Sequence, residues 1–73
     1  MQVTYSKQAD AMYIRFGEEG EGVVAQTEEV RPGLLLDYSH DGRLYGIELL
    51  EASMKVPSEA LALFQIGVLE PAA

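Results

Sequence analysis

The chain has 73 residues, which suits one small domain, and its 12 acidic and 5 basic residues give a formal net charge of −7. Nucleic acids and anionic membranes are bound mainly through Lys and Arg, so we expect this chain to bind neither. It contains no cysteine and only one histidine, which excludes disulfides, thiolate metal sites and histidine-rich metal sites.

The first residues, Met1 to Lys7, lack the basic segment followed by an apolar stretch that marks a secretory signal. The longest apolar runs are far shorter than the ~20 residues that a membrane-spanning helix needs. We therefore expect a cytoplasmic protein.

Hydrophobic patterning predicts five β-strands, at about residues 2–5, 11–16, 23–27, 34–38 and 44–50. The second shows the clearest alternation, because Met12, Ile14 and Phe16 are apolar at every other position. The glycines and glutamates of residues 17–22 predict a loop. Pro32-Gly33 and Asp41-Gly42 predict turns, the latter with Gly42 in the left-handed region.

The periodicity changes after Pro57. Ser58 is a suitable N-cap, and Leu61, Phe64 and Val68 follow at helical spacing, so we expect a helix at about residues 58–66. The predicted fold is α+β: a single domain over residues 1–73, with a small antiparallel β-meander of about five strands and a C-terminal helix packed on one face.

The Asp-Gly hairpin predicts which residues share a face of the sheet. If Ser39 lies opposite Arg43 and the pairing continues without a break, both faces of the last two strands are largely apolar. One short helix covers one face only, so we expect another protein to cover the other, either a second copy in a homodimer or a basic protein partner. The expected interface consists of Leu34, Leu36, Tyr38 and Leu44.

Three blocks of sequence, at residues 5–16, 32–38 and 41–53, resemble the YuzE-like family, which is domain-of-unknown-function family 2283. Members read approximately Y-D-x-E-A-D-A-L-Y-I, G-V-I-V-D-Y-D-x-D-G and G-I-E-I-L-x-A-S. The chain departs from this pattern at Ser6, where the family commonly has Asp. The resemblance implies a small prokaryotic protein of unassigned function, and it leaves an antitoxin-like role open.

The strongest polar constellation is Asp10, Tyr13, Arg15 and Glu48. Tyr13 and Arg15 share a strand face, and Glu48 becomes a possible partner of Arg15 if the second and fifth strands are neighbours. These residues are candidates for a binding site, although a network that fixes the strand register explains the same pattern.

Other polar residues carry less information. His40 lies in a predicted turn, and the spacing of Glu18, Glu19 and Glu21 is not that of a calcium-binding loop. No nucleophile, phosphate-binding or zinc motif is present, so we expect no enzyme activity, no catalytic residue, no metal and no cofactor.

The leading hypothesis is a small acidic protein-interaction module. The alternatives are a small-ligand or metal-binding protein that uses Asp10, Arg15 and Glu48, and a structural domain without a partner.

Overall fold

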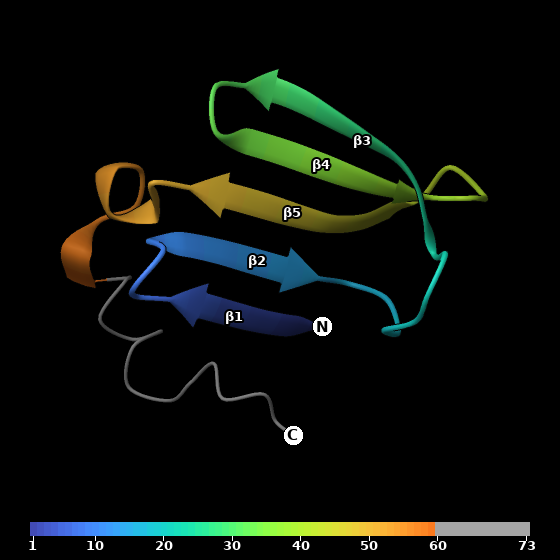
Figure 1. Ribbon diagram of the computed structural model, residues 1–73, viewed down its shortest axis with the longest axis horizontal. Helices are drawn as coiled ribbons and strands as arrows, with labels where there is room; N and C mark the ends of the chain where they lie inside the picture. The colour runs from blue at the N-terminus through green and yellow to red at the C-terminus, as the bar shows by residue number, and fades with distance from the viewer. Residues whose placement is uncertain (60–73) are drawn as a thin grey trace.

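A computed structural model describes residues 1–59 of the chain, and these residues form one antiparallel sheet with a short 3₁₀ turn (Figure 1). The elements are β1 (Gln2–Ser6), β2 (Ala11–Arg15), β3 (Val24–Arg31), β4 (Leu34–Ser39), β5 (Leu44–Leu50) and η1 (Ala52–Met54). β3 continues to Arg31, four residues beyond the expected end. Gly33 and Gly42 both have positive φ angles, as the two turns require.

The strand order is β1-β2-β5-β4-β3, which corrects the expected simple meander. The long loop after β2 allows β3 to form the far edge of the sheet, so that β5 and β4 lie between β2 and β3. β4 and β5 then return by hairpins, and β5 pairs with β2 (Figure 1). Turn signals predict hairpins between consecutive strands, but they do not specify where a longer connection ends.

The α+β assignment is wrong for the described part of the chain, which is mostly β. The one complete helical element between residues 1 and 59 is η1, and the last two described residues, Ser58 and Glu59, are in α-helical conformation. No α-helix within residues 1–57 packs on the sheet. The predicted helix over residues 58–66 lies outside the described residues except for its first two positions.

A bulge in β5 overturns the expectation that both sheet faces are apolar. Tyr38 lies opposite Leu44, as predicted, but the next pair is Asp37 with Gly46, so Tyr45 is an extra residue. The pairing beyond this point is displaced by one residue. Because directly paired residues share a face, this displacement exchanges the β5 residues that meet each face of β4.

The register therefore defines an apolar face and a polar face. The apolar face carries Val3, Tyr5, Met12, Ile14, Leu34, Leu36, Tyr38, Ile47 and Leu49. At its β3 edge this face is polar, because Gln26, Glu28 and Arg31 pair with Tyr38, Leu36 and Leu34. The polar face carries Gln2, Thr4, Tyr13, Arg15, Thr27, Glu29, Asp37 and Glu48, together with Leu35 and Leu50.

Burial is concentrated at one end of the apolar face. Met12 and Ala52 are buried, and Val3, Tyr5, Leu49 and Val56 pack against them. The backbone N–H of Ala52 donates to the carbonyl of Asp10, which joins η1 to the connection between β1 and β2. The described residues contain no helix long and apolar enough to cross a membrane.

Candidate functional site

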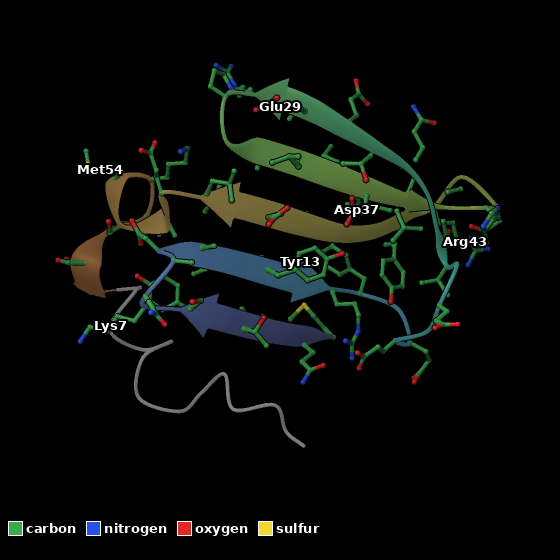
Figure 2. All side chains as sticks on the ribbon, viewed as in Figure 1. Lys7, Tyr13, Glu29, Asp37, Arg43 and Met54 are labelled. Atoms are coloured by element: carbon green, nitrogen blue, oxygen red, sulfur yellow. The ribbon has the colours of Figure 1, made fainter. Side chains whose placement is uncertain are left out.

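The polar face contains a hydrogen-bonded network that connects three strands. Tyr13 on β2 and Asp37 on β4 lie close together in Figure 2, and Tyr13 donates its hydroxyl proton to Oδ2 of Asp37 at 2.7 Å. Thr27 on β3 donates to Oδ1 of the same carboxylate at 2.6 Å. The Tyr13 side chain must cross β5 to reach Asp37. It does so above Gly46, where a Cβ atom would lie 2.1 Å from the tyrosine oxygen.

This environment raises the pKa of the Tyr13 phenol above its ordinary value of 10.0. The main cause is partial burial, and the hydrogen bond to Asp37 and the negative charge of that carboxylate add to it. The phenol therefore remains a neutral hydrogen-bond donor at physiological pH. It is suited to fixing Asp37 in place and not to acting as a base.

Asp10 occupies a different place, at the end of the sheet beside η1. Its carboxylate accepts hydrogen bonds from the Tyr5 hydroxyl at 2.8 Å, the Ser53 amide at 2.9 Å and the Ser53 hydroxyl at 2.6 Å. The Ser53 hydroxyl, followed by the Tyr5 hydroxyl, lowers the pKa of Asp10. Asp10 also has a φ angle of 52°, so it combines a left-handed turn conformation with three acceptor contacts.

Arg15 does not form the predicted pair with Glu48. Its guanidinium lies 3.4 Å from Glu19, donates from Nε to the carbonyl of Gly17 and donates from Nη2 to the Gln2 side chain. Glu48 is paired in register with Tyr13, on the strand next to β2, as the hypothesis required. The structure thus brings the two strands together but directs Arg15 toward the loop after β2.

The four predicted binding residues are not joined in one hydrogen-bonded cluster. Tyr13 and Glu48 lie opposite each other on β2 and β5, and Tyr13 bonds to Asp37. Arg15 is directed toward the loop after β2, and Asp10 lies at the end of the sheet beside η1. Asp37 and Thr27 were not predicted from the sequence as partners in a network with Tyr13. Gly46 was the available signal, because a glycine inside a strand often marks close approach of another group.

The predicted interface residues lie together. Leu34 pairs with Leu49, Leu36 pairs with Ile47 and Tyr38 pairs with Leu44. Leu34, Leu36 and Tyr38 are half-buried, and Leu44 is 38% exposed. The first three lie on β4 and Leu44 lies on the neighbouring strand β5, all on the apolar face.

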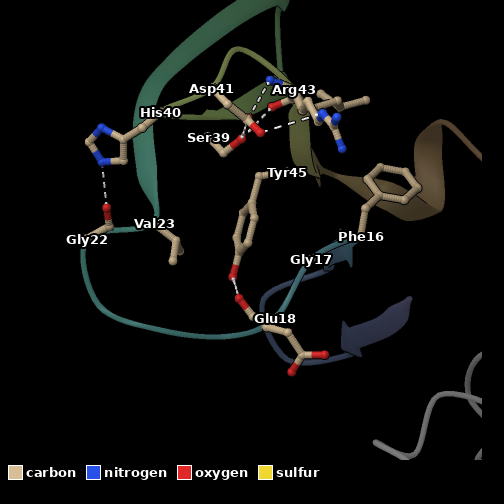
Figure 3. Close-up of a pocket in the computed structure, with 11 residues that line it drawn as sticks. Phe16, Gly17, Glu18, Gly22, Val23, Ser39, His40, Asp41, Arg43 and Tyr45 are labelled. Carbon is tan, nitrogen blue, oxygen red and sulfur yellow. Dashed lines mark hydrogen bonds and ion pairs between the residues drawn. The ribbon is translucent and has the colours of Figure 1, made fainter.

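A concave feature, drawn in Figure 3, lies at the end of the sheet away from η1 (compare Figure 1). It is an open pocket of about 720 Å³ between the loop after β2 and the β4–β5 turn. Its apolar lining is Phe16, Val23, Leu44 and Tyr45, and its polar lining includes Glu18, His40, Asp41 and Arg43. This pocket was not predicted from the sequence, because the loop over residues 17–22 and the Asp41-Gly42 turn are far apart along the chain.

His40 belongs to this region. Its Nε2 atom lies 2.7 Å from the carbonyl oxygen of Gly22, so the imidazole connects the turn to the loop (Figure 3). No group of three His, Asp or Glu side chains among residues 1–59 is arranged to hold a metal ion.

Comparison with known proteins identifies one family. Residues 2–53 match a family described as a protein of unknown function, DUF2283. No match was found among curated proteins or among solved structures.

Proposed function

Since the chain belongs to the family of proteins of unknown function DUF2283, we propose a role from its surface: it binds a basic protein through the apolar face of its sheet. The family assignment supplies no activity, so the proposal depends on the chemistry of that face.

The supporting observation is the separation of apolar from polar side chains by the sheet. Among the described residues of the apolar face, only Met12 is buried, while Ile14, Leu34, Leu36 and Ile47 remain half-buried. Contiguous apolar surface of this kind is characteristic of protein-binding sites. Burial of the remaining area provides the driving force for association.

Charge determines which partner we propose. A formal net charge of −7 on a chain of 73 residues opposes close approach of a second copy and accelerates encounter with a basic protein. An antitoxin-like role is one form that such binding would take. Self-association remains an outcome that the experiment must be able to detect.

The test compares two adjacent leucines of β4 that lie on opposite faces. Tagged wild-type protein, Leu36→Ser and Leu35→Ser are each recovered from the native host, and the copurifying proteins are quantified by mass spectrometry. We expect a basic polypeptide in near-stoichiometric amount with wild-type and Leu35→Ser, and its loss with Leu36→Ser. Circular dichroism shows whether both variants remain folded.

A second measurement does not depend on substitutions. Raising the ionic strength during recovery should decrease the amount of the partner, because screening weakens attraction between opposite charges. Recovery of the bare chain, equal loss with both leucine variants, or a homodimer in light scattering would contradict the proposal.

A further inference from the structure

The pocket at the end of the sheet away from η1 has features of an anchor site. We infer that it receives a single large apolar side chain from a Lys- or Arg-rich segment of the partner. This inference rests on the proposed function and specifies the chemistry of the segment that is bound.

The apolar lining supplies the first argument. Phe16 is 43% exposed and Leu44 is 38% exposed, although both are large hydrophobic residues. Tyr45 beside them is buried, with 8% of its surface exposed. A hollow with aromatic and aliphatic walls is the usual environment for a hot-spot side chain in a protein interface.

The pocket is already held in shape on both sides. The Tyr45 hydroxyl donates to the carbonyl of Glu18 at 2.8 Å, and the backbone N–H of Phe16 donates to the carbonyl of Tyr45 at 2.8 Å. On the other side, His40 contacts the carbonyl of Gly22 (Figure 3). These bonds order the loop before a partner arrives, which decreases the entropy lost on binding.

The charges around the pocket favour basic neighbours of the bound side chain. Glu18 and Asp41 line the pocket, and Glu19 and Glu21 belong to the same loop. The two nearby arginines are each beside a carboxylate already, with Arg15 3.4 Å from Glu19 and Arg43 3.5 Å from Asp41. With Glu19 and Asp41 beside these arginines, Glu18 and Glu21 supply the remaining acidic charge, which matches Lys or Arg on either side of an apolar anchor.

The test uses a defined peptide, acetyl-Lys-Lys-Phe-Lys-Lys-amide, titrated into the ¹⁵N-labelled full chain and followed by NMR. We expect saturable shifts of the amide signals of Gly17, Val23 and Tyr45. A peptide with Ala in place of Phe tests the apolar anchor, and a peptide with Glu in place of Lys tests the basic neighbours. Each should bind about tenfold more weakly or not measurably.

Two surface substitutions of similar exposure provide the matched control. Phe16→Ser should weaken binding of the Lys-Lys-Phe-Lys-Lys peptide about tenfold. Val30→Ser on β3, where the native side chain is 42% exposed, should leave it unchanged. The double variant Glu18→Gln/Glu21→Gln should retain binding but decrease its dependence on salt.

The outcomes separate this inference from the proposed function. Absence of saturable shifts, or equal binding of the Ala peptide, overturns the anchor site even if Leu36→Ser still abolishes copurification. In the reverse case, peptide binding that Phe16→Ser removes supports the pocket even if the apolar face recovers no partner.

Discussion

The two faces of the sheet use the same five strands in different ways. On the apolar face, side chains gather around Met12, and on the polar face hydrogen bonds connect Tyr13, Asp37 and Thr27. One face thus depends on packing, and most of its large apolar side chains are half-buried. On the other face, the side chains of Tyr13, Asp37 and Thr27 form hydrogen bonds with one another.

A single extra residue produces this difference. Without the bulge at Tyr45, Leu36 would lie opposite Gly46, and Leu35 would share a face with Ile47. Each face would then mix leucines with polar groups. The bulge places Leu36 opposite Ile47 and Asp37 opposite Gly46, which separates the two kinds of side chain.

The largest expected effect comes from the apolar face. Met12→Ala should decrease the free energy of unfolding by about 2–5 kcal/mol, because it leaves a cavity beside Ala52 and Leu49. Urea denaturation followed by circular dichroism measures the loss. Leu50→Ala is the control, since Leu50 is 39% exposed on the polar face and should cost much less. Equal losses would remove the contrast in packing between the faces.

The next effect tests how the polar face is built. Gly46→Ala should cost about 1–3 kcal/mol, because the new methyl group would occupy the space of the Tyr13 ring. In a Tyr13→Ala background the same change should cost less, although the carbonyl of Ile14 still lies 3.0 Å from the new Cβ position. Equal costs in both backgrounds, measured by a double-mutant cycle, would show that Tyr13 and Gly46 make independent contributions to stability.

A smaller effect is expected when only the hydrogen bond is removed. Tyr13→Phe should cost about 1 kcal/mol, because Asp37 loses one donor and keeps Thr27. Spectrophotometric titration gives an independent measurement. The pKa values of Tyr13 and Tyr5 are both raised, Tyr5 chiefly by its hydrogen bond to Asp10. Wild-type should therefore show two tyrosines that ionise above the ordinary range, and Tyr13→Phe should show one fewer. Identical titration curves would contradict the network.

The raised pKa of Tyr13 determines how the free energy of unfolding changes with pH in alkaline solution. Because the folded pKa of Tyr13 exceeds the unfolded value near 10, its contribution to stability is complete below pH ~10 and decreases as the pH rises further. Tyr13→Phe should reduce this decrease.

The smallest effect concerns Asp10, which joins the sheet to η1. Its folded pKa is lowered, so its contribution to stability is present above the unfolded value near pH 4 and decreases as the pH falls through the folded value. We expect wild-type to be more stable than Asp10→Asn at neutral pH and the difference to diminish in acid. A constant difference across this range would show that the carboxylate charge contributes nothing.

Local signals in the sequence explain much of the sheet. Alternation at Met12 and Ile14 indicated β2, and Asp41-Gly42 indicated the hairpin, whose turn is closed by a bond from the Gly42 amide to the carbonyl of Ser39. Both depend on short-range physics, namely the period of two in a strand and the positive φ that glycine tolerates.

The candidate sites were less accessible from the sequence. Arg15 and Glu48 were expected to pair, and they do lie on adjacent strands, yet Glu19 and Gln2 satisfy the arginine. Leu34, Leu36 and Tyr38 do share one face, with Leu44 opposite Tyr38, while their role as an interface stays a prediction. Which of several nearby groups a side chain bonds to depends on distances in space, and these cannot be read from the spacing of residues along the chain.

The sequence by itself determined the acidic charge, the β-strand character and the turns, because each follows from residues close together in the chain. Only the tertiary structure decided the strand order, the bulge at Tyr45 and the separation of the faces. The strand order depends on where β3 joins the sheet after the long loop. The separation of the faces depends on the one-residue displacement in the pairing of β4 with β5. Such choices are made by contacts between distant segments.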